Sequence, residues 1–422
     1  MINVMEKALT PKGFRDYLPR QMRLRNFVVS ILRQTFEKYG FEPLETPTLE
    51  YASTLLGKYG EEADRLVYTF KDKGDRDLGL NYDLTVPTAR VLASYQQEIK
   101  LPFKRYQIQR AYRAEKPQKS RYREFTQCDI DIFGSSSPLA DAEILAVINE
   151  SLVAVGLTDF EIRINSRQVL FRILADSGVL ETTLKMSAIQ TLDKLGKISW
   201  DGVTSELIEK GLDNTQIKAI QEAVSVSQPD DVLNQVMSAA WQLGVPKERL
   251  VFSPTTARGL DYYTGVIFET VVTKAGIGSV TGGGRYDDLV KKLGGPDLPA
   301  TGTTLGLDRL CDALSILYLV PEAVKGSAVT VLICLAEDAA SVSNYALEVV
   351  KDLRSGGVAS EIFLVSKSLD NQLKYASEKN IPWVVIIGDK EVTSNKLTVK
   401  NLKTRQQEEL LLGEFKDRLA AS

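Results

Sequence analysis

The polar side chains best placed to do chemistry lie in residues 125–133, which read FTQCDIDIF. Strand-like alternation puts Gln127, Asp129 and Asp131 on one face and mainly apolar side chains on the other. Two carboxylates and an amide in a row are costly to bury without partners. This face is therefore either a solvated sheet surface or the polar wall of a binding site, and the stretch alone leaves both open.

The strand expected before this stretch continues the polar surface. Residues 102–113 (PFKRYQIQRAYR) place Arg105, Gln107, Gln109 and Arg113 on one face, and the loop AEKPQKS then leads into the second strand. The two strands form a long-loop β-hairpin. A basic cluster surrounds the loop: Arg110, Arg113, Lys116, Lys119, Arg121 and Arg123. Such a cluster binds a triphosphate or nucleic acid through charge-assisted contacts, or it is ordinary surface charge.

Glycine marks two further stretches. Residues 281–290 (TGGGRYDDLV) carry three successive glycines in a strand context. A ligand or another backbone must approach closely there, unless the run is a bulge or a tight turn. Residues 302–310 (GTTLGLDRL) lead through Gly306 into a helix with Asp308 and Arg309, a pairing common in surface salt bridges. Neither stretch has the glycine spacing of a P-loop or of a dinucleotide-binding fold.

An arginine and two adjacent tyrosines open the stretch 257–269, ARGLDYYTGVIFE. If these residues form a strand, Tyr262 and Tyr263 point to opposite faces. At most one of the two tyrosines then faces a given pocket. The stretch alone does not say what Arg258 does.

The chain of 422 residues contains no histidine. That absence excludes Ser–His and Cys–His nucleophile pairs, an imidazole general base and histidine metal ligands. The three cysteines, Cys128, Cys311 and Cys334, are far apart in the sequence and form no CxxC pair. This spacing argues against a zinc site or a disulfide framework and for a reducing cytoplasm. The net charge of −3 gives no sign of a polyanionic partner, so nucleic-acid contacts must come from local patches.

The elements that must position these residues are those of an α+β protein. Residues 23–41 carry apolar side chains at helical spacing with Gly40 at the expected end, and strands are expected at 160–166, 265–273 and 301–306 besides the hairpin. Consecutive strands with few crossover helices favour an antiparallel sheet packed by helices. Residues 167–235 break this pattern with helical sequence and little strand signal, which indicates a helical insertion.

After about residue 325, strand and helix patterns alternate, which indicates a separate α/β domain with buried strands. The sequence therefore predicts four segments: 1–166 and 236–325 as the two parts of a catalytic domain, 167–235 as the insertion and 326–422 as the C-terminal domain. The first residues lack the apolar core of a signal peptide, and no long uncharged apolar run occurs. We therefore expect neither secretion nor a membrane span.

Together these stretches resemble known motifs. YRAE at 112–115, the glycine-rich strand and GLDR at 306–309 are similar to motifs 2 and 3 of class II aminoacyl-tRNA synthetases. ARGLDYYTG, PKGFRDYLP at 11–19, YDLTVPTAR at 82–90 and GGGRYDDL at 282–289 narrow the resemblance to the histidyl-tRNA synthetase family. It runs from about residue 10 to the C-terminus, and REFTQCDIDIFG and DLTVP are closest to the archaeal and eukaryotic branch.

This resemblance implies ATP-dependent ligation of L-histidine to tRNA(His) through a histidyl-adenylate. It also implies Mg²⁺ with ATP, a cytoplasmic homodimer, a class II catalytic fold and an anticodon-binding domain at 326–422, with no resident metal ligands in the chain. The alternative is a synthetase-like regulatory or histidine-sensing paralogue without charging activity. Such relatives typically lose the C-terminal domain and parts of the catalytic motifs, whereas this chain retains both.

For ATP, the resemblance gives each matching residue a role. Arg113 would contact the α-phosphate, Glu115 the adenine amino group and Arg121 the terminal phosphates. Phe125 and Arg309 would sandwich the adenine ring, since a guanidinium stacks well on a π-face.

For histidine, the positions that hold the α-amino and carboxylate groups in the family are matched by Asp83, Thr85 and Gln127. Asp131 and Tyr263 match the imidazole-binding positions, and Tyr262 lies nearby. Arg258 matches the arginine that activates the α-phosphate, so Arg113 and Arg258 are the catalytic residues that the resemblance implies.

The chain departs from the family pattern at several positions. Ser120 replaces a common glycine of the motif 2 loop, and Thr126 stands where histidine or tyrosine is frequent, on the apolar side of its strand. We expect Ser120 to alter contacts with the tRNA acceptor end and Thr126 to have little effect. Asp83 and Asp131 occupy positions where bacterial relatives often carry glutamate, so the shorter side chains need a backbone shift or a water.

Overall fold

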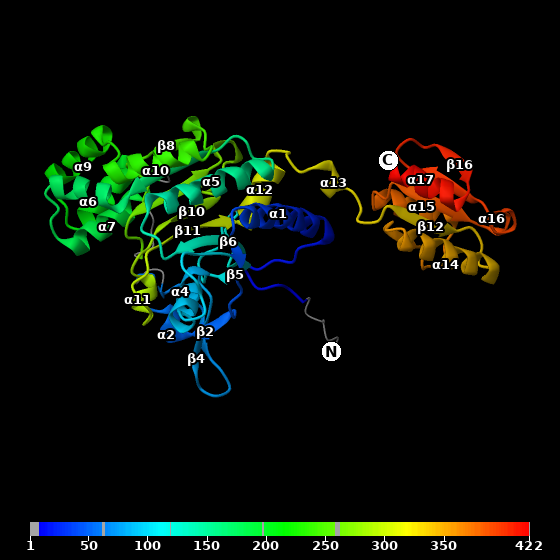
Figure 1. Ribbon diagram of the computed structural model, residues 1–422, viewed down its shortest axis with the longest axis horizontal. Coiled ribbons are helices and arrows are strands. Elements are labelled where there is room, and N and C mark those ends of the chain that lie inside the picture. The colour runs from blue at the N-terminus through cyan, green and yellow to red at the C-terminus, as the bar shows by residue number, and fades with distance from the viewer. Residues whose placement is uncertain (1–7, 61–63, 119, 196–197, 258–261, 422) are drawn as a thin grey trace, which may run out of the picture. The chain divides into compact units, whose positions relative to one another are not determined.

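The computed structural model describes residues 8–60, 64–118, 120–195, 198–257 and 262–421. The chain divides into two compact units, Met1–Leu319 and Val320–Ser422, each built on its own sheet (Figure 1). The division between the units lies a few residues before the boundary at 325/326 expected from the sequence. The four-segment division of the chain stays a prediction.

The described part of the first unit contains an eight-stranded sheet in the order β1-β5-β6-β11-β10-β9-β7-β8. Strands from β5 to β7 in this order are antiparallel, and the outer strands β1 and β8 pair in parallel with their neighbours. The bounds are β1 (Glu42–Pro43), β5 (Phe103–Tyr112), β6 (Glu124–Phe133), β11 (Ala300–Gly306), β10 (Thr281–Arg285), β9 (Val266–Val271), β7 (Glu161–Ser166) and β8 (Leu250–Phe252). The predicted α+β class with an antiparallel central sheet is confirmed.

Helices cover both faces of this sheet (Figure 1). The apolar side of β6, with Cys128, Ile130 and Ile132 buried, packs under α5 (Pro138–Ala154) and α12 (Leu307–Ile316), and α1 (Pro19–Lys38) packs on these two helices. On the other face lies α4 (Thr85–Ser94), whose Thr88 hydroxyl is 3.3 Å from the Gln107 side-chain oxygen on β5. The polar side of the hairpin is therefore enclosed between the sheet and α4.

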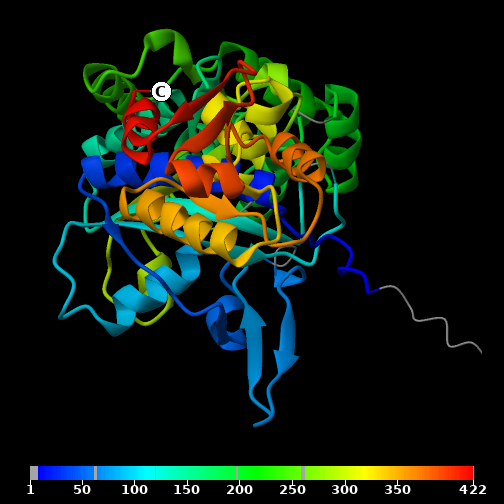
Figure 2. The same ribbon diagram turned by 90° about the vertical axis from the view of Figure 1, so that its right-hand side faces the viewer.

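A three-stranded sheet lies beside α4 in the same unit. It has the order β2-β4-β3, with β2 (Leu49–Tyr51), β4 (Asp77–Leu80) and β3 (Thr69–Lys71), and is accompanied by the short helices α2 (Ala52–Leu55) and α11 (Leu289–Lys292). The β3–β4 hairpin extends away from the body of the unit (Figure 1, Figure 2).

The helix-rich segment expected after residue 166 begins where Ser166 caps α6, its hydroxyl accepting from the Val169 N–H at 3.1 Å. Its helices are α6 (Arg167–Asp176), α7 (Thr182–Leu192), α8 (Trp200–Glu209), α9 (Asn214–Val226) and α10 (Asp231–Gln242). Asp213 and Asp230 cap α9 and α10 in the same way. The last helix packs on α5 and runs past residue 235, so the expected end of the insertion falls inside α10. The 3₁₀ turns Lys247–Arg249 and Thr273–Ala275 follow.

The glycine run of β10 is explained by neighbouring backbone. β10 is paired on both sides, and a Cβ on Gly283 would overlap the carbonyl of Gly302 on β11. Gly284 has φ +156° and lies against the carbonyl of Val266 on β9. Of the possibilities that the sequence left open, close approach of other strands accounts for these two glycines.

The second unit is an α/β fold. The sheet in its described residues has the order β13-β12-β14-β15-β16, parallel over the first three strands and antiparallel thereafter. The strands are β13 (Ser360–Ile362), β12 (Val331–Leu335), β14 (Trp383–Ile387), β15 (Leu397–Asn401) and β16 (Gln407–Leu410), and the helices are α13 (Glu322–Lys325), α14 (Ala340–Ser355), α15 (Leu369–Glu378), α16 (Asp389–Ser394) and α17 (Leu412–Ala420). Separate apolar clusters cover the two faces of the sheet. In neither unit does a described helix have the length and apolar character needed to cross a membrane.

Candidate active site

The polar face of the β5–β6 hairpin is buried. The strand register pairs Arg105 with Asp131, Gln107 with Asp129 and Gln109 with Gln127. Asp129 and Asp131 are 1% and 2% exposed, and Arg105 is fully buried. A solvated sheet surface, one of the two possibilities for this face, is therefore excluded. Buried charges of this kind need partners, and the hairpin supplies them.

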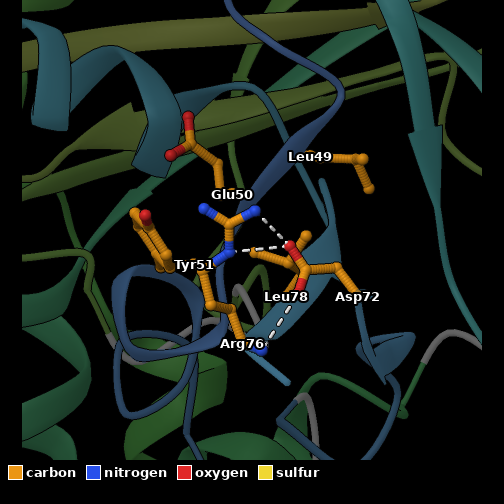
Figure 3. Close-up of a pocket in the computed structure, with 6 residues that line it drawn as sticks. All are labelled: Leu49, Glu50, Tyr51, Asp72, Arg76 and Leu78. Carbon is orange, nitrogen blue, oxygen red and sulfur yellow. Dashed lines mark hydrogen bonds and ion pairs between the residues drawn. The ribbon is translucent and has the colours of Figure 1, made fainter. Parts of the chain in front are cut away.

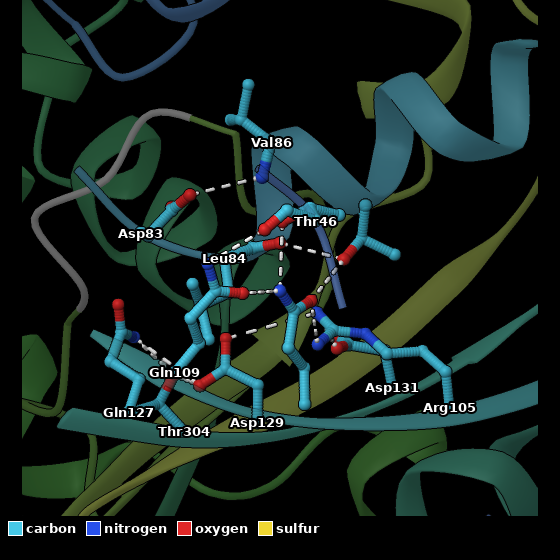
Figure 4. Close-up of polar contacts among 12 residues, drawn as sticks. Thr46, Asp83, Leu84, Val86, Arg105, Gln109, Gln127, Asp129, Asp131 and Thr304 are labelled. Atoms are coloured by element: carbon cyan, nitrogen blue, oxygen red, sulfur yellow. Dashed lines mark hydrogen bonds and ion pairs between the residues drawn. The ribbon is translucent and has the colours of Figure 1, made fainter. Parts of the chain in front are cut away.

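Arg105 is the cation of this face. Its Nη2 lies 2.5 Å from Asp131 Oδ2 and 3.9 Å from Asp129 Oδ2, and its Nη1 donates to the side-chain oxygen of Gln107 at 3.2 Å (Figure 4). The hydroxyl of Tyr286 donates to the other oxygen of Asp131. Burial raises the pKa of both carboxyl groups, that of Asp129 to about 8, although Arg105 opposes the rise. One guanidinium thus serves two carboxyl groups.

A chain of amides and hydroxyls surrounds the ion pair (Figure 4). The Gln107 amide donates to the Thr46 hydroxyl at 2.9 Å and to the Gln109 side-chain oxygen at 2.6 Å. On the next strand, the Gln127 amide donates to the Thr304 hydroxyl at 2.8 Å, and that hydroxyl donates to Asp129 Oδ1 at 2.6 Å. Within the described residues, Gln127 Oε1 and Asp129 Oδ2 are buried and accept no hydrogen bond. Two acceptors of the face are therefore left without a donor among the described residues, although Arg105 Nε, a buried donor of the same face, also makes no hydrogen bond there.

Asp83 lies where α4 begins, with Thr85 as the first residue of the helix. Its Oδ1 accepts from the Tyr59 hydroxyl and from the Val86 N–H, both at 3.1 Å, and its Oδ2 accepts from the Tyr262 hydroxyl at 3.4 Å. Burial raises the pKa of Asp83. The buried carboxyl group thus joins α4 to an aromatic cluster.

Tyr262 and Tyr263 belong to that cluster together. Both are buried, and their ring centroids are 4.8 Å apart; the Tyr262 ring also lies 5.6 Å from that of Tyr286. The expectation that the two tyrosines point to opposite faces was wrong, because β9 starts only at Val266 and neither residue is in a strand. Alternation does not apply outside a strand, so both rings reach the same side of the sheet.

The residues expected to contact ATP gather at the loop end of the hairpin. The Arg113 guanidinium lies 4.3 Å from the ring centroid of Tyr82 and 5.0 Å from that of Phe125. Arg121 forms an ion pair with Glu115. Arg309, at the start of α12, donates to the carbonyls of Ser279 at 2.5 Å and Ser120 at 3.5 Å. The structure thus brings these side chains from two elements to one end of the sheet.

Two residues of the sequence analysis lie outside the described part of the chain. They are Arg258, expected at the α-phosphate, and Lys119 of the basic cluster.

No role was predicted from the sequence for several buried groups around the hairpin. Arg105 was expected on the correct side of β5 but without a partner, and Tyr286 was expected only as a member of the glycine-rich strand. Asp308 was taken for half of a surface ion pair, but it is buried and paired with Arg15 and Arg25, which are distant in sequence. The sequence places Arg105 and Asp131 on one face of the hairpin, but their direct pairing depends on a strand register that only the structure shows.

The structure also shows the surroundings of Thr126 and Ser120, two residues that depart from the family pattern. Thr126 lies on the side of β6 that faces α12, where its N–H donates to Asp308 Oδ2 at 2.8 Å and its hydroxyl accepts from Arg25 at 2.7 Å. Ser120 has φ +56°, a left-handed conformation that glycine adopts without strain. The backbone at this position thus suits the glycine common in relatives.

A shallow depression of about 270 Å³ lies elsewhere in the unit, on the three-stranded sheet (Figure 3). It is lined by Leu49, Glu50, Tyr51, Asp72, Arg76 and Leu78. Arg76 and Asp72 bind each other within a turn, the guanidinium Nε donating at 2.7 Å. None of the expected site residues lines this depression. Across the described residues, no cluster of acidic and cysteine side chains is arranged to hold a metal ion.

Comparison with known proteins gives a consistent result. A family model described as "Histidyl-tRNA synthetase" matches residues 13–310, and one described as "Anticodon binding domain" matches residues 330–422. Similar curated proteins include "Histidine--tRNA ligase" of Rhodopirellula baltica, 39% identical, and of Aeropyrum pernix, 40% identical, with 96% of each chain covered in both cases. A solved histidyl-tRNA synthetase from Nostoc sp. PCC 7120 superposes with a TM-score of 0.82 at 29% identity, over 98% of this chain and 99% of that chain.

Proposed function

The chain belongs to the histidyl-tRNA synthetase family, and we propose that it ligates L-histidine to tRNA(His) through the side chains described above. The observation that carries the assignment of residues is the enclosed polar face of the hairpin, rich in acceptors, which adjoins an arginine-rich end. A face rich in acceptors suits a ligand with many N–H donors, and an arginine-rich end suits a triphosphate.

Histidine would occupy the face that carries Asp131. An imidazole needs an acceptor for its N–H and a partner for its other nitrogen, which Asp131 and the Tyr263 hydroxyl would provide. Arg105 and Tyr286 fix the Asp131 carboxylate from both of its oxygens. A pocket that pairs both ring nitrogens rejects amino acids that leave it unsatisfied, by about 10⁴-fold or more.

The α-ammonium group of histidine would meet the acceptors of Gln127 and Asp83. Gln127 Oε1 is buried and accepts no hydrogen bond from the described residues, and Asp83 offers two carboxylate oxygens beside α4. Thr85 adds a hydroxyl at the first residue of that helix. We assign these residues to the amino and carboxylate groups of the substrate.

ATP would bind at the loop end of the hairpin, where a ring and guanidinium groups can contact the base and the phosphates. Glu115 and Arg121 pair with each other in this structure, so ATP binding must open the pair before Glu115 reads the adenine amino group and Arg121 reaches the terminal phosphates. Phe125 and Arg309 would hold the adenine ring, and Arg113 the α-phosphate. Mg²⁺ would arrive with ATP as part of the substrate.

The first step needs no general base. The histidine carboxylate, ionised at neutral pH, attacks the α-phosphorus, and the bond to pyrophosphate breaks. The protein aligns the reactants and neutralises charge on the α-phosphoryl group, for which we assign Arg113 and Arg258. In the second step a ribose hydroxyl of tRNA attacks the adenylate carbonyl, AMP leaves, and an adenylate phosphate oxygen takes the proton. A chain without histidine is therefore equipped for both steps.

The regulatory alternative is not favoured. The relatives reported above are named as ligases, and the chain retains Arg113, Arg309 and a segment that matches the anticodon-binding model. We also propose that Val320–Ser422 binds the anticodon. A cytoplasmic homodimer, with residues 23–51 in the family's motif 1 region, is likewise proposed from the family resemblance.

Replacing Arg258 with alanine tests the mechanism. We expect histidine-dependent pyrophosphate exchange to fall by about 10²–10³-fold, because a preorganised donor to the α-phosphoryl group is lost. Histidine affinity in direct titration changes little. The Arg258→Lys variant, which keeps the charge but not the fork of donors, recovers only part of the rate. Near-normal exchange by Arg258→Ala contradicts the assignment.

A further inference from the structure

The segment Pro11–Tyr17, PKGFRDY, lies against the hairpin loop that would bind ATP. The N–H of Arg123 donates to the Gly13 carbonyl at 2.9 Å, and its guanidinium donates to the Lys12 carbonyl at 3.3 Å and to the Glu115 carbonyl at 3.0 Å. Gly13 has φ +89°, and a Cβ there would lie 2.8 Å from Arg123 Cγ. We call this segment the N-terminal strap; it binds the loop through its backbone.

Arg15 links the strap to two elements at once. Its Nη1 donates to the Tyr122 hydroxyl at 2.8 Å, and its Nη2 donates to Asp308 Oδ1 at 2.8 Å. The guanidinium also lies 3.8 Å from the centroid of the Tyr122 ring. Tyr122 belongs to the loop, next to Arg121, whereas Asp308 precedes Arg309 on α12. The planar fork of Arg15 thus spans the two groups of residues assigned to ATP.

Asp308, one of the two residues that Arg15 contacts, is itself held by several hydrogen bonds. It is buried, it accepts from Tyr17 of the strap and from Arg25 of α1 at 2.7 Å, and its second oxygen accepts from the Thr126 N–H. These contacts hold the start of α12 to the strap, to α1 and to β6. The loop, by contrast, carries a positive φ at Ser120 and an ion pair that ATP must open. Arg15 therefore connects the loop, which must adjust when ATP binds, to the start of α12, which is held in place.

We propose that Arg15 is a positioning residue for ATP, holding the loop of Glu115 and Arg121 at a set distance from Arg309 on α12. This inference rests on the proposed function, since it names which substrate the strap serves. The contacts of Arg15 are to Tyr122 of the loop and to Asp308 on α12, and neither residue is among those proposed to bind histidine. The strap should therefore act on ATP use and leave histidine binding unchanged.

The test is pyrophosphate exchange with the full-length chain, varying ATP and histidine separately. Arg15→Met is expected to raise the KM for ATP at least 10-fold, with the KM for histidine within twofold of the parent. Arg20→Met, which removes an exposed arginine of α1, should match the parent. Arg15→Lys separates positioning from charge balance, because one ammonium can pair with Asp308 but cannot also hold Tyr122. A positioning role predicts that Lys behaves like Met, whereas a purely structural role predicts that Lys restores the parent values.

Tyr122→Phe covers the case in which Arg15→Met does not fold. It removes the hydroxyl that Arg15 contacts and keeps the ring, so we expect a rise of about 3- to 10-fold in the KM for ATP. Added to Arg15→Met, it should have no further effect, since the two groups act through one contact. Equal loss for both substrates, full rescue by Lys, or an unchanged KM for ATP each overturn the inference. A parent chain that shows no histidine-dependent exchange refutes the proposed function instead.

Discussion

Asp131 and Asp308 are buried aspartates of the same unit, each bound by arginine and by a tyrosine hydroxyl, yet they are held in opposite ways. Burial alone would raise the pKa of Asp308, but Arg25, Tyr17, the Thr126 N–H and Arg15 lower it below its usual value. Burial raises the pKa of Asp131, because Arg105 is shared with Asp129 and cannot compensate for both. The two pKa values shift in opposite directions because the carboxylates differ in the number of donors around them, not because one is buried more deeply.

This difference separates a structural carboxylate from one available to a ligand. Around Asp308, donors arrive from the strap, α1 and β6, and the carboxylate has little left to offer. Around Asp131, Gln127 Oε1 and Asp129 Oδ2 are buried and accept no hydrogen bond from any described residue. Histidine brings an ammonium group and a ring N–H, which are the groups that such a face lacks.

Removing the charge of Asp308 should have the largest effect on stability. Asp308→Asn leaves the Arg15 and Arg25 cations facing a neutral side chain, so we expect a loss of about 3–5 kcal/mol in the free energy of unfolding at pH 7. The measurement is urea unfolding followed by circular dichroism. Because the folded-state pKa is lowered, the contribution of Asp308 is present above its unfolded pKa near 3.8 and is lost as the pH falls below that value. The difference between parent and variant should therefore shrink as the pH falls below 3.8, and equal stability at pH 7 would show that the donors around Asp308 stabilise nothing.

Removing the charge of Asp131 should instead affect the substrate. Asp131→Asn keeps the size of the side chain but weakens the acceptor for the imidazole N–H, a loss of about 1.5–3 kcal/mol, or roughly 10- to 100-fold in the KM for histidine. The KM for ATP should change far less in the same pyrophosphate exchange assay. Asp297→Asn, at an exposed position on the same unit, is the matched control. Equal loss for both substrates is incompatible with a role in binding the imidazole.

Asp129 should give the smallest effect, visible in the pH dependence of stability. Its folded-state pKa is raised to about 8, so its contribution is present below about pH 4 and is lost as the pH rises through 8. Asp129→Asn removes this dependence, and the variant should gain about 1–2 kcal/mol relative to the parent between pH 6 and pH 8. Thermal melts at the two pH values measure the gain. A constant difference would mean that Arg105 keeps Asp129 ionised throughout.

The sequence predicted which residues share a face of the hairpin but not that this face is buried. Alternation along residues 125–133 is local, whereas burial depends on α4 and on Thr46, which cross the face from distant parts of the chain. Arg105 could not be recognised as the partner of Asp131, because the sequence of each strand alone does not specify which residues pair across the hairpin. The arginines around Asp308 come from the first 25 residues, nearly 300 positions away.

The two tyrosines show a different limit. Their role in one cluster was missed because residues 262 and 263 were treated as part of a strand that begins later, at Val266. The apolar run after them predicts a strand, but its start cannot be read to within a few residues. The same uncertainty placed the end of the helical insertion inside α10. For the strand, the type of element was predicted correctly and its start was not.

Gly302 on β11 is paired with Asp131, and a Cβ at this position would overlap the Asp131 carboxylate. Positions 131 and 302 should therefore constrain each other during evolution. A lineage can acquire a side chain at 302 only after the carboxylate at 131 has moved or been lost, and the proposed contact to the imidazole would then already have been given up. Selection for histidine charging should therefore keep the glycine in place without that glycine ever touching a substrate.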